Sequence, residues 1–246
     1  AGLAIGIVDI LFSVIYLWLY PGLGSAKGSL NWTSTGQYEA EQARARAAIA
    51  PLYARFAAMD EKQLAADVQA MAIGERLFIN NCAACHGSDG RGSKGFPNLT
   101  DSDWLWGGSF ADVQKTITEG RNGVMPPMAE AIGGGDNVRN IAQYVLSLAG
   151  SPHDSVAAQL GKPKFAVCAA CHGPEGKGNP AVGAPNLTDK VWLHGWGEEA
   201  IAAMVNNGKN NAMPAQASRL TPEQIRVLAA YVLRLSQGTT KVAANP

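Results

Sequence analysis

The sequence predicts an all-α protein with an N-terminal transmembrane helix and two tandem copies of one small helical domain. Three observations support this fold class. Residues 1–20 are almost entirely apolar, two long segments repeat each other, and apolar residues recur at helical spacing at both ends of each copy. Between those ends Gly, Pro, Asn and Asp dominate, and no alternating strand pattern is present. We therefore expect helices joined by loops.

The composition narrows the classes of function. A chain of 246 residues has room for two ordinary domains, and its 20 basic and 20 acidic residues give a formal net charge of zero. No run of like charges is present, so we expect no nucleic-acid partner. Each domain of about 80 residues would bury little apolar surface alone, so we expect it to need a further source of stability. A large covalent cofactor would provide it.

The first 20 residues, AGLAIGIVDILFSVIYLWLY, contain one charge, Asp9, and are followed by PGLG. A helix rises ~1.5 Å per residue, so this stretch is long enough for a hydrocarbon core of ~30 Å. We expect a transmembrane helix within residues 1–24 that contacts the lipid bilayer. A cleaved signal peptide is the alternative, but its apolar core would be shorter, and Trp18 and Tyr20 lie at one end as residues of an interfacial belt do.

Residues 25–65 are expected to form a juxtamembrane linker followed by an amphipathic helix. Gly and Ser are frequent up to Tyr38, and residues 39–58 then combine helix formers with apolar residues at helical spacing. Pro51 is expected to kink or break this helix. Asp60 is expected to cap a further helix that starts at Glu61.

The repeat covers residues 66–150 and 156–238, which we expect to be two copies of one domain, with 239–246 as a C-terminal tail. Each copy contains CAACHG, PNLTD, Trp-Leu, Met-Pro and a closing apolar helical segment, in that order. The spacings agree to within a residue or two, which chance would not give.

All four cysteines of the chain lie in the two CAACH segments, as Cys82 and Cys85 and as Cys168 and Cys171, each pair followed by a histidine. Thiols three residues apart on a helical turn, followed by an imidazole, present all three groups to one side. Two thiols can add to the vinyl groups of a haem while the imidazole binds its iron, which is c-type haem attachment. We therefore expect two covalently bound haem c groups, with His86 and His172 as axial iron ligands.

Three other uses of these cysteines fit the sequence less well. A thioredoxin-like redox pair needs a βαβ setting, and a zinc ribbon would join its two CxxC pairs through a shorter, more β-like segment. Disulfides between cysteines three residues apart are rare in a helix, and none of these alternatives uses the histidine.

A methionine recurs in both copies as the candidate sixth iron ligand. Met125 and Met213 follow the motif histidines by 39 and 41 residues, and each is followed by Pro and precedes the closing helix. A thioether is soft and neutral, so it binds Fe(II) well and raises the reduction potential. Met128 is the rival in the first copy, but its counterpart is Gln216, so we assign Met128 to packing. His/Met ligation leaves no open position for substrate and points to electron transfer.

Two further pairs are candidates for supporting the haems. Pro97 and Pro185 lie where a backbone carbonyl could accept the ring N–H of the motif histidine and fix its tautomer. Trp104 and Trp192 could donate an indole N–H to a haem edge or propionate, although plain core aromatics would recur as well.

Small and aromatic residues also recur where the opening and closing helices of each copy are expected to cross. This set comprises Gly74, Phe78 and Tyr144 in the first copy and Gly161, Phe165 and Tyr231 in the second. The remaining histidines, His153 and His194, are expected to be loop histidines, with a hydrogen bond to a haem propionate as the alternative.

With these residues in hand, both copies resemble class I cytochrome c domains, and the chain resembles the membrane-anchored di-haem subunit of cbb3-type cytochrome c oxidase. Beyond the haem motifs, the resemblance depends on Tyr20-Pro21-Gly22-Leu23-Gly24 and on Trp32-Thr33-Ser34 followed by Gln37-Tyr38 and Glu39. It covers roughly residues 11–238. It carries the family's covalent and axial positions onto Cys82, Cys85, His86 and Met125 and onto Cys168, Cys171, His172 and Met213.

The resemblance implies a subunit of the bacterial inner membrane with both haem domains in the periplasm. It implies electrons taken from soluble or membrane donor cytochromes and delivered through a mono-haem cytochrome c subunit to the catalytic haem–copper subunit, so the oxygen-reducing site lies outside this chain. A free-standing membrane-tethered shuttle like the two-domain c4-type cytochromes is the main alternative. A di-haem peroxidase is less favoured, because it needs one iron with a vacant or switchable sixth position.

The pairing between methionines and haems is left open by the sequence. Two similar domains joined by a short linker, residues 149–164, can each keep their own methionine or exchange the loop that carries it, since the same contacts form either way in a duplicated fold. We expect each copy to keep its own methionine.

Overall fold

The computed structural model describes residues 2–22, 24 and 27–242. Contacts divide the chain into two units, residues 1–55 and 56–246. The expected tail at 239–246 falls partly outside the described residues, since 243–246 are not described and 239–242 belong to the last helix.

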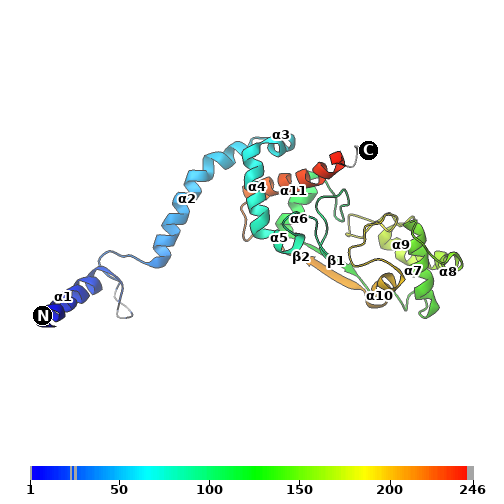
Figure 1. Cartoon of the computed structure of the whole chain (residues 1–246), viewed down its shortest axis with the longest axis horizontal. Coiled ribbons are helices and arrows are strands. Elements are labelled where there is room, and N and C mark those ends of the chain that lie inside the picture. The colour runs from blue at the N-terminus through cyan, green and yellow to red at the C-terminus, as the bar shows by residue number, and fades with distance from the viewer. Residues whose placement is uncertain (1, 23, 25–26, 243–246) are drawn as a thin grey trace. The chain divides into compact units, whose positions relative to one another are not determined.

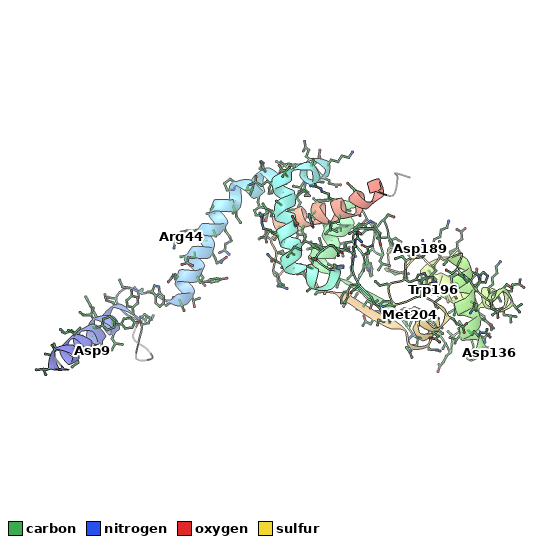
Figure 2. The ribbon with its side chains drawn as sticks, viewed as in Figure 1. Asp9, Arg44, Asp136, Asp189, Trp196 and Met204 are labelled. Carbon is green, nitrogen blue, oxygen red and sulfur yellow. The ribbon has the colours of Figure 1, made fainter. Side chains whose placement is uncertain are left out.

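The first unit is built from two helices, α1 (Gly2–Leu19) and most of α2 (Ser34–Ala57). Asp9 lies on α1 and Arg44 on α2 (Figure 2). Helix α2 starts five residues before the expected position and continues through Pro51, which does not end it. Within residues 2–22, 24 and 27–242, no helix is long and apolar enough to cross a membrane, so the transmembrane helix expected in residues 1–24 is not found there.

The second unit holds both sequence copies and is mostly helical, as expected (Figure 1). Its elements in chain order are α3 (Glu61–Ala66), α4 (Val68–Asn81), α5 (Ala83–His86), α6 (Phe110–Glu119), β1 (Arg121–Met125), α7 (Asp136–Leu148), α8 (Ser155–Gly161), η1 (Lys162–Phe165), α9 (Ala166–His172), α10 (Glu198–Asn207), β2 (Lys209–Met213) and α11 (Pro222–Val242). The expected cap is confirmed, because the Asp60 side chain accepts a hydrogen bond from the Gln63 backbone N–H at the start of α3.

Helix α11, which closes the second copy, packs against α4 and α6 of the first copy and against α3, which precedes that copy. The crossing of α4 and α11 is close, because a Cβ at Gly74 would lie 2.6 Å from the Cβ of Tyr231. The rings of Phe78 and Tyr231 pack with centroids 5.7 Å apart. We call these four helices the α4–α11 group.

Helix α7, which closes the first copy, packs against α8, η1 and α10 of the second copy. A Cβ at Gly161 would lie 2.1 Å from the backbone oxygen of Asn140, and the rings of Tyr144 and Phe165 meet edge to face at 5.2 Å. We call these elements the α7–α10 group. Its core consists of buried residues from both copies, among them Ile141, Val145, Ile201 and Val205.

These contacts correct the expected helix crossings. Tyr144 does not pack with Gly74 and Phe78, and Tyr231 does not pack with Gly161 and Phe165; the two tyrosines have changed places. The physical reason is that both closing helices carry the same apolar face, so each fits the other copy's opening helix as well as its own. The boundaries 66–150 and 156–238 describe the sequence copies and stay a prediction for folding units.

The two strands form an antiparallel ribbon between the two helix groups (Figure 1). Gly123 lies opposite Asn211 at its centre. Strands were not expected, because neither five-residue segment alternates apolar with polar residues. Each strand follows a helix that ends at a glycine with positive φ, Gly120 (73°) after α6 and Gly208 (65°) after α10. The ribbon carries the chain from the helices of one copy to those of the other.

Candidate functional site

Each CAACH segment forms a short helix that ends at the histidine. Gly87 and Gly173, both at φ 78°, follow the two histidines and turn the chain sharply away, a backbone conformation that suits glycine. The histidine side chains are buried, with exposed fractions of 9% for His86 and 8% for His172. The segment therefore presents its imidazole to the interior of the protein.

A backbone carbonyl fixes each imidazole. The Nδ1 of His86 lies 2.9 Å from the carbonyl oxygen of Pro97, and the Nδ1 of His172 lies 3.0 Å from that of Pro185. Because a carbonyl only accepts, Nδ1 carries the proton and donates, which leaves the Nε2 lone pair free to bind a metal. The two imidazoles are thus held in the tautomer and orientation that an axial ligand requires.

The loops that supply these carbonyls are themselves held by matched hydrogen bonds. Asn98 Oδ1 accepts from the backbone N–H of Thr100 at 2.9 Å and from its hydroxyl at 2.8 Å. Asn186 Oδ1 accepts from the backbone N–H and hydroxyl of Thr188 at 3.0 and 2.8 Å. The PNLTD string that recurs in the sequence is therefore the turn that holds each proline carbonyl against its histidine.

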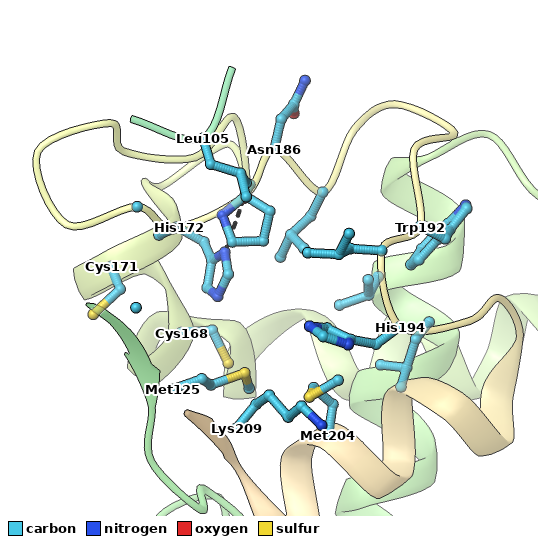
Figure 3. A pocket seen from close by; sticks show the side chains of 18 of the residues that line it. Leu105, Met125, Cys168, Cys171, His172, Asn186, Trp192, His194, Met204 and Lys209 are labelled. Atoms are coloured by element: carbon cyan, nitrogen blue, oxygen red, sulfur yellow. Dashed lines mark hydrogen bonds between the residues drawn. The ribbon is translucent and has the colours of Figure 1, made fainter. Parts of the chain in front are cut away.

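A cavity of about 410 Å³ adjoins His172, a volume in the range of ~300–1,000 Å³ typical of ligand and cofactor sites. Cys168, Cys171 and His172 line it from the second copy, and Met125 lines it from the first copy. Figure 3 shows the imidazole of His172 directed into the cavity, with the Met125 side chain on the other side of the space. The structure thus brings two cysteines, one histidine and one methionine to a single cavity.

Met125 lines the cavity of the second copy's histidine in this structure, an arrangement that the expectation that each copy keeps its own methionine does not predict. Met125 and Met128 pack against the core of the α7–α10 group, as does Cys168. The Met128 backbone N–H donates to the carbonyl of Val205 on α10 at 2.8 Å. Met125 reaches the second copy because β1 carries it there. Met128 and Met204 also line the cavity, so three thioethers are near this site.

None of the four cysteines, all of them within the described residues, forms a disulfide; Cys82 and Cys168 are partly buried, and Cys85 and Cys171 are exposed. Burial, with a smaller effect of Cys85, raises the pKa of the Cys82 thiol to about 11. Burial also raises the pKa of Cys168. Within the described part of the chain, no cluster of three or more His, Cys, Asp or Glu side chains could hold a metal ion.

The residues that line the cavity beside His172 fit a large, mostly apolar group. Aliphatic residues such as Ile141, Val145 and Leu187 line it, and Val145 and Ile141 also belong to the core. The indole Nε1 of Trp192 is buried there without a hydrogen-bond partner. A buried donor without an acceptor is costly, and a haem with acidic side groups would supply one. The residues present therefore fit haem c.

The two tryptophans of the repeat lie in different surroundings. Trp192 lines the cavity, whereas Trp104 packs on Gly108, where an added Cβ would lie 2.4 Å from the indole Cδ1. The sequence predicts the same role for Trp104 and Trp192, because the two residues occupy the same position in the two copies.

The two histidines outside the repeat also differ. His153 is exposed, and its Nδ1 lies 2.8 Å from the carbonyl of Ser151. His194 is half-buried at the cavity, where its Nε2 lies 2.8 Å from Asn211 Nδ2. Because the amide N–H donates to it, Nε2 carries a lone pair. Burial, followed by the positive charges of Lys209 and Lys94, lowers the pKa of His194.

A group of three carboxylates at this cavity was missed by the sequence analysis. Asp101 and Asp103 from the first copy and Asp189 from the second all line it. Burial raises the pKa of Asp101 and of Asp103, and the charge of Asp189 raises both further. The recurring Asp of PNLTD was a sequence signal for two of these carboxylates, Asp101 and Asp189. Only the contact between the copies brings all three carboxylates to one cavity.

The chain matches the family described as cytochrome c oxidase, cbb3-type, subunit III, over residues 69–145 and 162–232. It is 66% identical over 237 residues to the cbb3-type cytochrome c oxidase subunit CcoP of Rubrivivax gelatinosus, covering 96% of this chain and 78% of that protein. It is 45% identical over 179 residues to subunit FixP of Azorhizobium caulinodans, covering 69% and 61% of the two chains. It is 37% identical over 250 residues to subunit FixP of Bradyrhizobium sp. strain ORS 278, covering 94% and 86%.

Both matched ranges contain one CAACH segment and one Met-Pro, and together they include every residue assigned to the two candidate haem sites. The chain therefore belongs to the family of subunit III of cbb3-type cytochrome c oxidase, and it is an electron-transfer subunit of that respiratory complex.

Proposed function

We propose that the chain binds two haem c groups covalently, one through Cys82 and Cys85 and one through Cys168 and Cys171. His86 and His172 are the first axial ligands, and Met125 and Met213 are the sixth ligands. When bound, a haem c supplies a one-electron Fe(III)/Fe(II) couple. The observation that carries this proposal is the cavity that joins Met125 with Cys168, Cys171 and His172.

The residues around each histidine prepare it for iron binding. The carbonyls of Pro97 and Pro185 accept from Nδ1–H, which orients the ring and increases the basicity of Nε2. The ring is thus held in place before any iron is bound, so little reorganisation of the histidine would be needed when the iron changes charge. That property suits electron transfer.

The ligand set also explains why the chain relays electrons and does not react with substrates. A histidine and a methionine would together hold each haem iron, so no position would remain for oxygen or peroxide. A soft, neutral thioether favours Fe(II) and so raises the reduction potential. Trp192 adds an indole N–H that we assign to the haem edge or a propionate in the second copy; Trp104, packed on Gly108, has weaker support for the same role.

As a member of the oxidase complex, the chain has other oxidase subunits as partners. We assign to it a soluble or membrane donor cytochrome c as electron source and a mono-haem cytochrome c subunit as electron acceptor, which passes electrons to the catalytic haem–copper subunit. Both haem domains are placed in the periplasm at the bacterial inner membrane. The exposed apolar side chains of α1, including Leu3, Ile10 and Phe12, support contact with lipid or with membrane subunits.

The number of haems tests the proposal directly. The purified chain should contain two haem c per polypeptide, still attached after denaturation. Replacing Cys82 and Cys85 by Ala, or Cys168 and Cys171 by Ala, should leave one haem each. A denatured chain that releases its haem, or a Cys variant that keeps both haems, would refute covalent attachment at these pairs.

Copurification separates an oxidase subunit from a free shuttle. When the oxidase is isolated in mild detergent, this chain should remain with the catalytic subunit. Loss of the chain at low ionic strength, with the remaining complex intact, would favour the free-standing shuttle.

A further inference from the structure

We infer that His194 takes up the proton that accompanies reduction of the second haem, the one attached through Cys168 and Cys171. The imidazole of His194 accepts one proton from solvent as the iron gains one electron from the donor cytochrome, so the net charge of the site stays the same. The inference rests on the proposed haem attachment for the redox group. It goes beyond that proposal by assigning a residue that links the reduction potential of this haem to pH.

His194 lines the same cavity as the motif histidine His172. Figure 3 shows the rings of His172 and His194 both directed into this space. His194 is half-buried, so solvent can supply and remove its proton. Most of the other side chains that line the cavity are apolar, and charges in such surroundings are weakly screened. A charge on the His194 ring therefore acts on a redox group held by His172.

Three parts of the chain hold the ring of His194. Asn211 on β2 donates from its side-chain Nδ2 to Nε2 of the ring at 2.8 Å. The Gly95 backbone N–H donates to the carbonyl of Leu193 at 2.7 Å, which holds the residue before His194 against the first copy. A Cβ at Gly95 would lie 4.0 Å from the ring atoms Cε1 and Nδ1. The ring is therefore fixed beside the cavity.

The hydrogen-bond partner of His194 suits two protonation states, unlike the partner of His172. The carbonyl of Pro185 only accepts, so it holds His172 with a proton on Nδ1. The side-chain amide of Asn211 has a donor and an acceptor. It donates to Nε2 of the neutral ring, and after a half-turn of the amide its oxygen accepts from Nε2–H of the charged ring. Protonation of His194 therefore keeps its hydrogen bond to Asn211.

Two lysines place positive charge near His194. Lys209 lines the same cavity, and Lys94 Nζ lies 3.9 Å from where a Cβ at Gly195 would stand. Burial first, and then the charges of Lys209 and Lys94, lower the pKa of His194 from its ordinary value of 6.5. At neutral pH the ring is therefore uncharged, and it can accept a proton when the charge near it becomes less positive.

Further charged side chains line the cavity or lie on the loop, helix and ribbon beside it. They are Asp101, Asp103, Arg121, Asp189, Lys190, Glu198 and Glu199. Burial raises the pKa of Asp101 and of Asp103, so these two carboxylates also titrate at higher pH than usual. The acidic side groups of a bound haem would raise the proton affinity of His194 in both redox states. The contribution of His194 is therefore measured against a variant that lacks only its imidazole.

Reduction of the second haem changes the proton affinity of His194. The iron loses one positive charge, so the pKa of His194 is higher in the reduced protein than in the oxidised protein. Between these two pKa values reduction takes up a proton, and the reduction potential falls as pH rises. Above both values the ring is neutral in either state and this contribution is zero. Because the pKa is lowered, the oxidised protein releases the proton below pH 6.5.

Redox titration at several pH values tests the inference. In the full chain with Cys82 and Cys85 replaced by Ala, the second haem is read alone from its visible spectrum. Its reduction potential should fall with rising pH within about pH 5 to 8. His194→Gln, which stays polar but does not titrate, should flatten this fall. His153→Gln is the matched control, because His153 is exposed and bonded to a nearby backbone carbonyl. Equal pH slopes with and without His194→Gln overturn the inference.

A lysine variant tests the same charges independently. Lys209→Gln removes the positive charge that lowers the pKa of His194 most, so the pH range in which the reduction potential falls should move to higher pH. Lys190→Gln is its control, because that side chain is exposed. If Lys209→Gln leaves this range where it is, His194 is not the group that takes up the proton.

Nuclear magnetic resonance of the His194 ring gives the answer without a substitution at His194, should His194→Gln fail to fold. The ring should titrate with a higher pKa in the reduced chain than in the oxidised chain. Equal pKa values in the two states overturn the inference, while the haems stay as proposed. A chain with no covalent haem at Cys168 and Cys171 refutes the proposed function at that site, and the inference with it.

Discussion

Tyr231 lies directly against Gly74, so that a Cβ added at Gly74 would stand 2.6 Å from the Cβ of Tyr231. Gly74 belongs to α4 of the first copy, and Tyr231 belongs to α11 of the second. The closest helix crossing of the α4–α11 group therefore joins segments more than 150 residues apart in a 246-residue chain. The fold of the first haem site depends on the C-terminal helix.

Gly74→Ala should destabilise the protein by roughly 1–3 kcal/mol, because the neighbouring atom is a Cβ fixed to the α11 backbone and cannot swing away. Thermal unfolding monitored by circular dichroism measures the change. Arg76→Ala on the same helix is the control; its side chain is exposed, so its effect should stay within about 0.5 kcal/mol. Equal stability of the Gly74 and Arg76 variants would mean that this crossing is absent in solution.

Asp189→Asn should raise stability near neutral pH and flatten its pH dependence. Burial and then the charge of Asp189 raise the pKa of Asp103 above its ordinary value of 3.8. Above pH 3.8 the folded protein therefore holds more protons than the unfolded chain, and stability falls as pH rises through the folded pKa. Removing the Asp189 charge lowers that pKa, so less stability is lost.

Unfolding midpoints measured from about pH 4 to 7 give the slope for each variant. Asp89→Asn is the control, since Asp89 is exposed and pairs with Arg91 away from the cavity. Parallel pH profiles for the wild type and Asp189→Asn would show that the three carboxylates do not interact.

Trp192→Phe should lower the reduction potential of the second haem by tens of millivolts. In the proposed second haem site the indole N–H would donate to a haem propionate, and the loss of that hydrogen bond, worth ~1 kcal/mol, would favour the more positive oxidised iron. Redox titration of the chain that retains only the second haem measures it. Trp196→Phe is the control because Trp196 is 59% exposed on the same loop (Figure 2). If the Trp192→Phe variant has the same reduction potential as the Trp196→Phe control, the indole of Trp192 contributes only to packing.

The sequence was sufficient for the helical class and for the local geometry of each motif. CAACH sets two thiols and an imidazole by spacing alone, and a Pro carbonyl was expected where His86 and His172 find one. Local signals of this kind act within one or two helical turns. They specify contacts that do not depend on which copy supplies the closing helix.

The packing of each closing helix on the opening helices of the other copy could not be predicted from the sequence, because the two closing helices present equivalent apolar faces. Tyr144 and Tyr231 occupy the same position in the repeat, so either could pack on Gly74. The ribbon was missed for a related reason. The segments Arg121–Met125 and Lys209–Met213 have little strand character alone and pair only because the fold brings these two segments of the chain together. Contacts between segments far apart in the sequence therefore determine which closing helix packs in which group, and local sequence patterns do not.

Electron relay through two closed iron sites is tested most directly by spectroscopy of the whole chain. The oxidised protein should show the thioether-to-iron charge-transfer band with an amplitude for two low-spin haems per chain, and the reduced protein should not bind carbon monoxide. A high-spin signal, or carbon monoxide bound to either reduced haem, would show an open iron position and contradict the assignment of the chain as a pure electron-transfer subunit with His/Met ligation at both sites.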